Sequence, residues 1–498
     1  MKFLPALVVS VSLTLTRGLQ AEETKALSLD DCIRSALSLN MDIRISRYSP
    51  QYGQLDLSAA YANWDPTLDM RASETFRSQA AIAIPGQPNT RASESTADNY
   101  NMGLRGLTPV GLSYNLFADY TQIEGFESRA LEIEGTTTSY QPTTGMSLVQ
   151  PLLKNFWIDP TRYTIAISKL GIKQDEQSVR QQIISTVTQV TLAYYNFIFT
   201  RDNVKVQQKA LELAERSLME NKKRVEVGAM APLEEKQAES QVARSRSDLL
   251  TAQQLSERAE NALKELIDDD FAKLDAIRIE PTEALTATPV LLNKQDSWHR
   301  GLTLRPEILQ SIVNLEQNKV TVRFTRNQLF PQLDLTGGFG LTAFDRDRSL
   351  AFDQIEGRRN PNHNFGARLS IPLSNRASRT AHQRSKLQGE EQLLRHKKLE
   401  QQVMVEIANA MQDARIAFEK VDSTKQGRVY AEAALDAEQK KLENGKSTSF
   451  FVLQLQRDLT TAQSAEIGAL TEYNRALARL AQAEGYTLDQ RKIFVEYR

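Results

Sequence analysis

The histidines and the single cysteine are the side chains whose types could bind a metal or act in catalysis. They show no spacing typical of metal ligands, and they are His299, His363, His382, His396 and Cys32. Ordinary solvated histidines are therefore expected. Cys32 lies in LSLDDCIRSAL, an apolar helical pattern, so we expect a buried thiol rather than a reactive one.

Motifs of enzyme chemistry are not found either. Neither Gly-x-Ser-x-Gly nor His-Glu-x-x-His occurs in the sequence. The run GGFG at Gly337 does not stand between a strand and a helix as a phosphate loop requires, so its glycines are expected to relieve crowding in a strand. The sequence thus supports no enzyme, no metal site and no cofactor. Its function must therefore be inferred from the helices and strands that it predicts.

Composition and charge narrow the class of protein. The 498 residues include only 22 Gly, 16 Pro and 7% aromatic residues, which favours long helices over several compact domains. Residues 1–21 carry Lys2 and then the apolar run FLPALVVSVSLTLT, which predicts a secretory signal peptide and a mature chain from Glu22. Without Lys2 and Arg17, 59 basic residues remain against 62 acidic ones, which argues against a nucleic-acid partner. No later segment has about 18 consecutive apolar residues, so any membrane span is predicted to be β.

One phrase occurs twice in the chain. DPTLDM at Asp65 returns as FPQLDL at Phe330, and at the same offset ALSLNMDI from Ala36 lies opposite GLTLRPEI from Gly301. A match that keeps its register over this length predicts two copies of one structural unit.

A long helix is predicted from Arg162 to Val227 by apolar residues that recur every seven positions, as in a coiled-coil seam. These residues are Ile183, Val190, Phe197, Val204, Leu211, Leu218 and Val225. The intermediate positions begin apolar, at Val187 and Tyr194, and then become polar, so the seam is narrow.

A short turn predicts that this helix is paired with an antiparallel partner. In VGAMAP, Gly228 suits a helix C-terminus and Pro232 the first turn of the next helix, predicted over 233–266. The second copy repeats the plan with a helix over 377–443, the turn ENGKSTS and a helix over 450–483. The predicted shorter helices span about 28–62 and 297–328.

Segments of period two lie between the shorter and the longer helices. In the second copy HNFGARLSIPLS alternates apolar and polar residues. The alternating stretches of the first copy are Leu68–Phe76, Tyr100–Leu104, Leu112–Tyr120 and Thr143–Val149. With two in the second copy we favour six strands per chain; the alternative is two long strands in the first half with a bend at Pro109. The pattern fits lipid-facing barrel strands or half-buried strands of a soluble sandwich; the signal sequence favours the barrel. Six strands cannot close a membrane barrel, so several chains must contribute.

The predicted domain organisation follows the repeat. It comprises a signal peptide at 1–21, a first repeat at 22–268 with strands at about 66–152 and a hairpin at 161–268, an equatorial linker at 269–296, a second repeat at 297–485 with strands at about 332–373 and a hairpin at 376–485, and a tail at 486–498.

Taken together, these features resemble the TolC family of outer-membrane factors. The resemblance is carried by LSLDDCIRSAL, the doubled Pro-x-Leu-Asp, RPEI at Arg305, VQPLLKNF from Val149 to Phe156 and RVEVGAMAPLEEKQAE at the first hairpin turn. It implies a mostly α fold with a small β part, in which three chains form an outer-membrane β-barrel continued by a periplasmic α-helical barrel. Pro66 and Pro331 would mark the crossings from helix to strand.

The family's usual four strands per chain would give about 12 in a trimer, whereas the six favoured here would give about 18. The implied function is a passive exit duct for a tripartite efflux pump or a type I secretion system. Its implied partners are a periplasmic adaptor, an inner-membrane transporter reached through that adaptor, and outer-membrane lipid. The alternative is a periplasmic coiled-coil tether, which would not explain strands at matching points of both copies.

The resemblance also assigns roles to the hairpin turns. It places adaptor docking at Val227, Gly228, Ala229, Met230, Asn444, Gly445, Lys446 and Ser447. Aligned on Gly445, the family's two gate aspartates fall at Phe451 and Gln454, while Glu234 keeps the family's acid and the tyrosine and arginine positions hold Leu442 and Ser447. We therefore expect an apolar constriction at Phe451, with a weak Glu234 to Lys446 pair, instead of a charged ring. The alternative is that Phe451 packs between helices and never reaches the pore.

Overall fold

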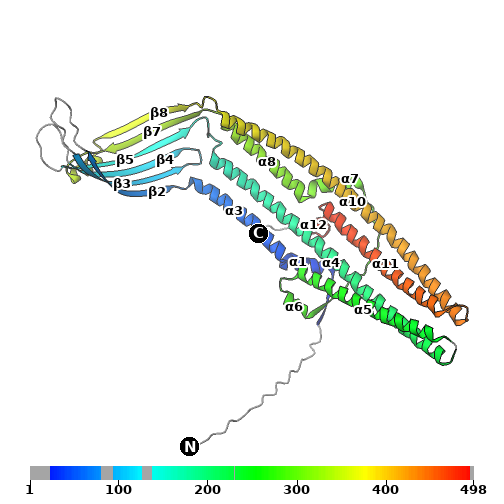
Figure 1. Ribbon diagram of the computed structural model, residues 1–498. Helices are drawn as coiled ribbons and strands as arrows, with labels where there is room; N and C mark the ends of the chain where they lie inside the picture. Colours follow the sequence, from blue (N-terminus) through cyan, green and yellow to red (C-terminus); the bar gives the residue numbers. More distant parts are fainter. Residues whose placement is uncertain (1–22, 80–92, 126–136, 229, 494–498) are drawn as a thin grey trace, which may run out of the picture. The chain divides into compact units, whose positions relative to one another are not determined.

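The computed structural model describes residues 23–79, 93–125, 137–228 and 230–493 (Figure 1). The predicted signal peptide, residues 1–21, and Ala229 lie outside these ranges. The chain divides into two compact units. The first takes its described residues from Met1–Ile45, Gln181–Leu304 and Val403–Val495, and the second from Ser46–Arg180 and Arg305–Gln402. Each predicted repeat contributes to both units.

Two long helical hairpins occur where the seven-residue pattern predicts them. The first pairs α4 (Pro160–Glu226) with α5 (Pro232–Ile267), and the second pairs α10 (Arg376–Glu443) with α11 (Ser449–Ala483). In Figure 1, α5 runs back along the C-terminal part of α4, and α11 runs back along α10. Within the described residues, none of the helices is long and apolar enough to cross a membrane.

The other helices and the strands of the first unit are shorter than those of the two hairpins. They are β1 (Glu23–Leu27), α1 (Leu29–Leu39), α2 (Met41–Ser46), α3 (Tyr48–Tyr61), the 3-10 turn η1 (Ala62–Trp64), α6 (Phe271–Asp275), β6 (Ile277–Pro281), α7 (Lys294–Leu304), α8 (Pro306–Asn327), α9 (Arg348–Glu356) and α12 (Thr487–Gln490). Strands β1 and β6 form a parallel pair within the first unit.

The two shorter helices that we expected to be continuous are each broken. The breaks fall at Asn40 and Arg305, which lie 265 residues apart, the offset of the sequence repeat. Both residues leave the helical region with ψ 127°. The side chain of Asn40 accepts hydrogen bonds from the next helix's N–H groups, at Asp42 (3.0 Å) and Ile43 (3.2 Å), whereas Arg305 precedes Pro306 and is driven into an extended conformation.

The predicted coiled-coil seam of α4 is buried only in part. Ile183, Val190 and Phe197 are at most 3% exposed, and the intermediate residues Val187 and Tyr194 are fully buried. Beyond Phe197 the seam residues towards the end of α4 are half-buried, and the intermediate positions are polar. The helix is thus packed tightly in its middle and more loosely near the hairpin turn.

Among the described residues, six antiparallel strands form the sheet of the second unit, in the order β2-β3-β4-β5-β7-β8. Their bounds are β2 Thr67–Gln79, β3 Ser93–Leu107, β4 Ser113–Gly125, β5 Thr137–Pro151, β7 Gln332–Thr342 and β8 Pro361–Ser370. The prediction of six strands is confirmed, because a tight turn separates β3 from β4. In that turn the N–H of Thr108 donates to the carbonyl of Leu112 (2.8 Å), and Gly111 has φ +84°.

Several predicted strand boundaries are wrong, because β4 continues to Gly125 and β5 already begins at Thr137, and two further boundaries differ for identifiable reasons. The sequence predicts a strand only over Tyr100–Leu104, whereas β3 begins at Ser93 because its polar outer half is paired with both neighbours. The alternation in the last strand suggests continuation to Leu373, but β8 ends at Ser370 just before Ile371 and Pro372, and Pro has no N–H for a ladder.

The two faces of the sheet differ in polarity. Strand register aligns an apolar row that comprises Leu68, Leu104, Leu116, Met146 and Phe339. We call the face that holds this row the apolar face. The opposite face is rich in Gly, Ser, Thr and Asn, and we call it the polar face. Glycine is required at Gly145, since a Cβ there would lie 2.5 Å from the backbone carbonyl oxygen of Phe339, and a Cβ on Gly338 would displace the Asn364 side-chain amide. Within GGFG the predicted relief of crowding holds for Gly338 and Gly340, whereas a Cβ on Gly337 would make only ordinary contact with Phe365.

Candidate functional site

The hairpin turns are built on glycines in the left-handed region. Gly228 has φ +72° and its N–H donates to Val225 (3.0 Å). Gly445 has φ +68°, and the following N–H of Lys446 reaches back to Lys441 (2.8 Å), which closes the last turn of α10. A Cβ on either glycine would meet nothing within 4 Å, so the backbone conformation rather than space requires glycine there.

Two aromatic side chains begin α11 and stay exposed. Phe450 is 48% and Phe451 53% exposed, and their rings meet edge to face at 5.7 Å. Gln454, one turn on, is also exposed. Within one chain Phe451 is therefore not packed between helices, and an apolar surface is available where the resembling family carries aspartates.

The predicted Glu234 to Lys446 ion pair is not formed within a single chain. No ion pair joins these two described residues, and Lys446 is exposed. Glu234 is half-buried, and its Oε2 has no hydrogen-bond partner. Near the second turn, Glu438 instead accepts from Ser447 and pairs with Lys441 (2.9 Å), and these hydrogen bonds lower the pKa of Glu438.

Polar bridges that the sequence analysis missed join α4 to α11, one helix from each hairpin. Asn221 donates to Ser449 (2.6 Å), with both side chains at most 4% exposed. Gln456 donates to Ser217 (3.0 Å), and Ser464 donates to Asn203 (2.7 Å). The sequence does contain a hint of these bridges, because Asn203 and Ser217 lie two heptads apart in a polar stripe of α4. That stripe does not identify the partner residues on α11.

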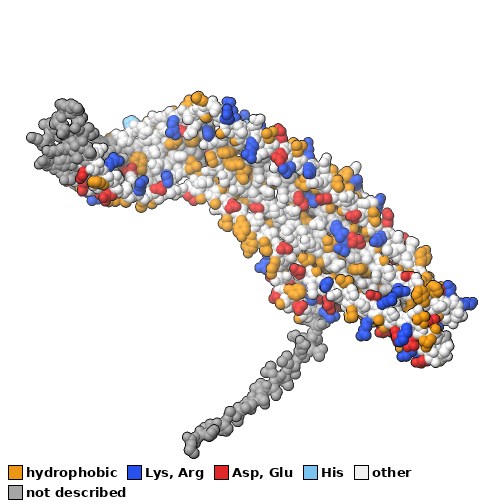
Figure 2. Space-filling view, viewed as in Figure 1, with side chains coloured by type: hydrophobic (Ala, Val, Ile, Leu, Met, Phe, Trp, Pro, Cys, Tyr) orange, Lys and Arg blue, Asp and Glu red, His pale blue; other side chains and the backbone are white. Residues whose placement is uncertain are grey.

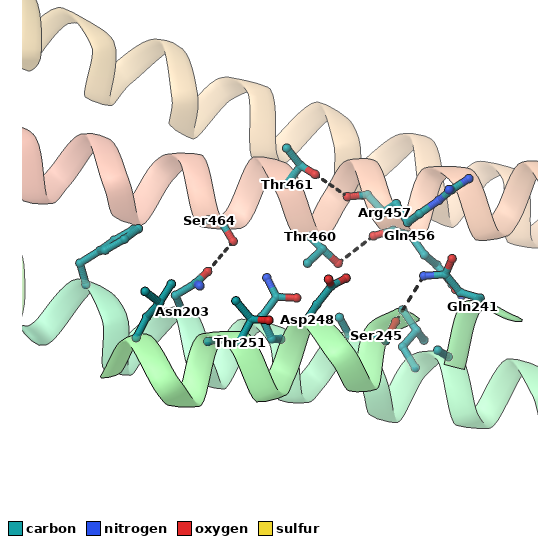
Figure 3. Close-up of a pocket in the computed structure, with 17 residues that line it drawn as sticks. Asn203, Gln241, Ser245, Asp248, Thr251, Gln456, Arg457, Thr460, Thr461 and Ser464 are labelled. Carbon is teal, nitrogen blue, oxygen red and sulfur yellow. Dashed lines mark hydrogen bonds between the residues drawn. The ribbon is translucent and has the colours of Figure 1, made fainter. Parts of the chain in front are cut away.

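A groove lined by both apolar and uncharged polar side chains lies beside these bridges, between α4, α5 and α11. Its volume is about 520 Å³. Figure 3 shows Asn203 and Ser464 facing each other at one end, with Gln241, Ser245 and Asp248 of α5 along the opposite wall. Hydroxyl and amide groups outnumber charges in this lining, so the groove suits hydrogen bonding rather than acid–base chemistry.

The doubled phrase places one Pro and one Asp at each crossing into the sheet. Pro66 directly precedes β2 and Pro331 directly precedes β7. The aspartate of each phrase pairs with an arginine of the neighbouring strand: Asp69 with Arg105 at 2.8 Å, and Asp334 with Arg368 at 3.5 Å. The two copies thus share a cross-strand ion pair as well as a proline directly before the strand.

The histidines and the cysteine do not assemble a reactive centre. Burial raises the pKa of Cys32 to about 12, and its side chain is fully buried. His396 Nδ1 lies 2.6 Å from Ser311 Oγ, and His382 contacts Thr325 at 3.1 Å. Across the described residues, no group of three or more His, Cys, Asp or Glu side chains could hold a metal ion.

Comparison with known proteins identifies the class. The sequence profile of the family described as "Outer membrane efflux protein" matches residues 136–268 and 299–486, more than half of the chain. The chain therefore belongs to the outer membrane efflux protein family, the TolC-like efflux channels of the outer membrane, which are transport proteins and not enzymes. Strands β2, β3 and β4 lie outside the matched residues.

Individual relatives agree with this class. The pyoverdine export outer membrane protein OpmQ of Pseudomonas aeruginosa is 25% identical over 320 residues, covering 61% of this chain and 62% of OpmQ. TolC of Escherichia coli is 21% identical over 374 residues, 74% of this chain and 73% of TolC. The aligned stretch thus spans less than two thirds of OpmQ.

Solved channels share the fold. The outer-membrane channel OprN superimposes with a TM-score of 0.67 at 17% identity, covering 92% of this chain and 89% of OprN. The Campylobacter jejuni channel CmeC gives 0.66 at 16% identity, covering 98% and 94%. The fold is accordingly mostly helical with long hairpins and an antiparallel sheet, as the sequence analysis predicts.

Proposed function

We propose that this chain is one subunit of a homotrimeric outer-membrane duct that passively conducts substrate from the periplasm to the exterior, as the exit component of a tripartite efflux pump or type I secretion system. The main support for the proposal is that both edge strands of the described sheet lack a second neighbouring strand. Strands β2 and β8 each have one neighbour, and their residues are almost all exposed. Pairing β8 of one subunit with β2 of the next removes every edge and gives about 18 strands in a closed trimer.

The apolar face of the sheet has the height of a bilayer. On β7 the side chains of this face extend from Leu333 to Ala343, the residue directly after the strand. The length of this stretch is about 33 Å at about 3.3 Å per residue. Tilted by about 40°, this band is about 25 Å tall, as in other outer-membrane barrels. A row of neighbouring tyrosines, Tyr100, Tyr120 and Tyr140, borders it, which suits a lipid–water interface.

The helical hairpins would form the periplasmic part of the duct. In this proposal the tips around Gly228 and Gly445 dock the adaptor, through which an inner-membrane transporter is reached. Three copies of Phe451 would form the apolar constriction that closes the periplasmic end by dewetting. The exposed position of Phe451 supports this role.

Electrophoresis of unboiled membranes tests the assembly. A duct should fractionate with the outer membrane and migrate as a trimer that boiling converts to monomer. Purified trimers should then conduct ions across planar bilayers. A chain that stays monomeric by native mass spectrometry in detergent and fractionates with the periplasm would support the coiled-coil tether instead.

A further inference from the structure

Charged side chains in the six strands are sorted by sheet face. Strand alternation places all four described strand arginines on the polar face, together with three aspartates: Arg71, Arg77, Arg105, Arg368, Asp69, Asp119 and Asp334. The charged residues on the apolar face of these strands are all acidic, and they lie further along the strands than its row of tyrosines. They are Glu74, Glu94, Asp98 and Glu124. Among the described strand residues, the polar face is thus the only one with fixed positive charge. In Figure 2, basic and acidic side chains lie close together over β2 and β3, so the assignment to faces comes from strand register.

Two of the three aspartates on the polar face are already neutralised. Asp334 is 3% exposed and pairs with Arg368, and Asp69 pairs with Arg105. Asp119 accepts a hydrogen bond from Asn101 (2.8 Å) but has no ion pair in the described chain. On the cationic side, Arg71 and Arg77 are exposed and make no ion pair with any described residue. Free positive charge therefore exceeds free negative charge on this face.

We infer that the passage bounded by the polar face favours small anionic cargo that carries carboxylate or phosphate groups. The inference rests on the proposed function, since the polar face lines a passage only if three sheets close. Guanidinium groups match carboxylates and phosphates geometrically and stay charged at every physiological pH. A passage with walls of low dielectric concentrates ions of the opposite sign, and rings of arginine are one way in which pores select anions. Closure of a trimer would repeat Arg71 and Arg77 three times around one passage.

Reversal potentials in a KCl gradient across planar bilayers test the inference, with chloride as the probe anion. The Arg71→Gln/Arg77→Gln double variant should lower the chloride-to-potassium permeability ratio by about two-fold or more relative to the unaltered duct. Asp69→Asn should change it in the opposite direction, because it releases Arg105 from its partner. Each comparison is made within the same duct, so contributions from the helical hairpins cancel.

The matched control neutralises charge on the other face. Glu74→Gln/Glu124→Gln removes the same number of charges, one from β2 and one from β4, and should leave the ratio unchanged. Equal shifts from both double variants, or no shift from the arginine variant, would overturn the inference while leaving the duct intact. Absence of any conductance from purified trimers would instead count against the proposed function.

Discussion

Asp334 of β7 and Arg368 of β8 stand directly opposite each other in the strand register, with carboxylate and guanidinium 3.5 Å apart. Asp69 and Arg105 form the equivalent pair at 2.8 Å in the first copy. The two aspartates differ in environment, because the Asp334 side chain is 3% exposed and that of Asp69 is 52% exposed. The repeat therefore provides an internal comparison of a buried and an exposed carboxylate.

Asp334→Asn should destabilise the sheet more than Asp69→Asn. The buried carboxylate also accepts from Gln332 (2.7 Å), so its loss weakens two contacts and should cost about 1–3 kcal/mol. The exposed pair should be worth about 0–1 kcal/mol. The measurement is the temperature at which trimers dissociate in detergent. Equal effects of the two substitutions would show that burial does not decide the strength of this contact.

Gly228→Glu and Gly445→Glu should abolish export while trimers still reach the membrane. Each adds bulk and charge at an exposed tip, and a non-glycine residue at φ near +70° costs about 1–2 kcal/mol. Asn at the same positions is the control, because Asn tolerates this conformation and adds no charge. Export should survive the Asn variants. Normal export by both Glu variants would contradict docking at the tips.

Phe451→Ala should raise the closed-state current in planar bilayers, because a smaller side chain widens an apolar constriction. Phe450→Ala is the neighbouring control, being similarly exposed and in contact with Phe451. Glu234→Gln should change the current little, since Glu234 makes no ion pair with Lys446 within a chain. If Glu234→Gln opens the pore and Phe451→Ala does not, a charge lock holds the duct shut.

Ser449→Ala should loosen the attachment of the second hairpin to the first. It removes the acceptor of the buried Asn221 amide and should cost about 1–3 kcal/mol. Faster amide hydrogen exchange is expected at the ends of α4 and α11, measured by mass spectrometry. Ser447→Ala, at the half-buried serine of the turn, is the control and should leave exchange in α4 unchanged. Unchanged exchange in both variants would show that the bridge contributes nothing.

Cys32 should resist thiol reagents between pH 7 and 9 in the folded protein and react quickly after unfolding. Burial raises its pKa from 9.0 to about 12, so folding favours the neutral thiol. The associated stability is fully present below the unfolded pKa and is lost as pH rises from about 9 towards 12. A Cys32→Ala/Ser38→Cys double variant, with the thiol moved to an exposed position, should react quickly while folded. Rapid labelling of folded Cys32 at pH 8 would contradict its burial.

The long helices, their turns and the number of strands could be predicted because each depends on local chemistry. Seven-residue spacing specifies the faces of α4, Gly228 and Gly445 supply backbone conformations that other residues resist, and the turn at Thr108–Leu112 is encoded in five adjacent residues. The sequence even repeated Asp69 and Asp334 at equivalent places, although it did not reveal their arginine partners.

Only the tertiary structure decided which distant residues meet. Asn221 and Ser449 are 228 residues apart, and no periodicity along either helix names the other as a partner. The polar start of β3 has no apolar alternation and becomes a strand because β2 and β4 satisfy its backbone on both sides. Likewise, strand register decides that Arg71 and Arg105 share a face with Asp119 and not with Glu74, because a slip of one residue would reverse every side chain.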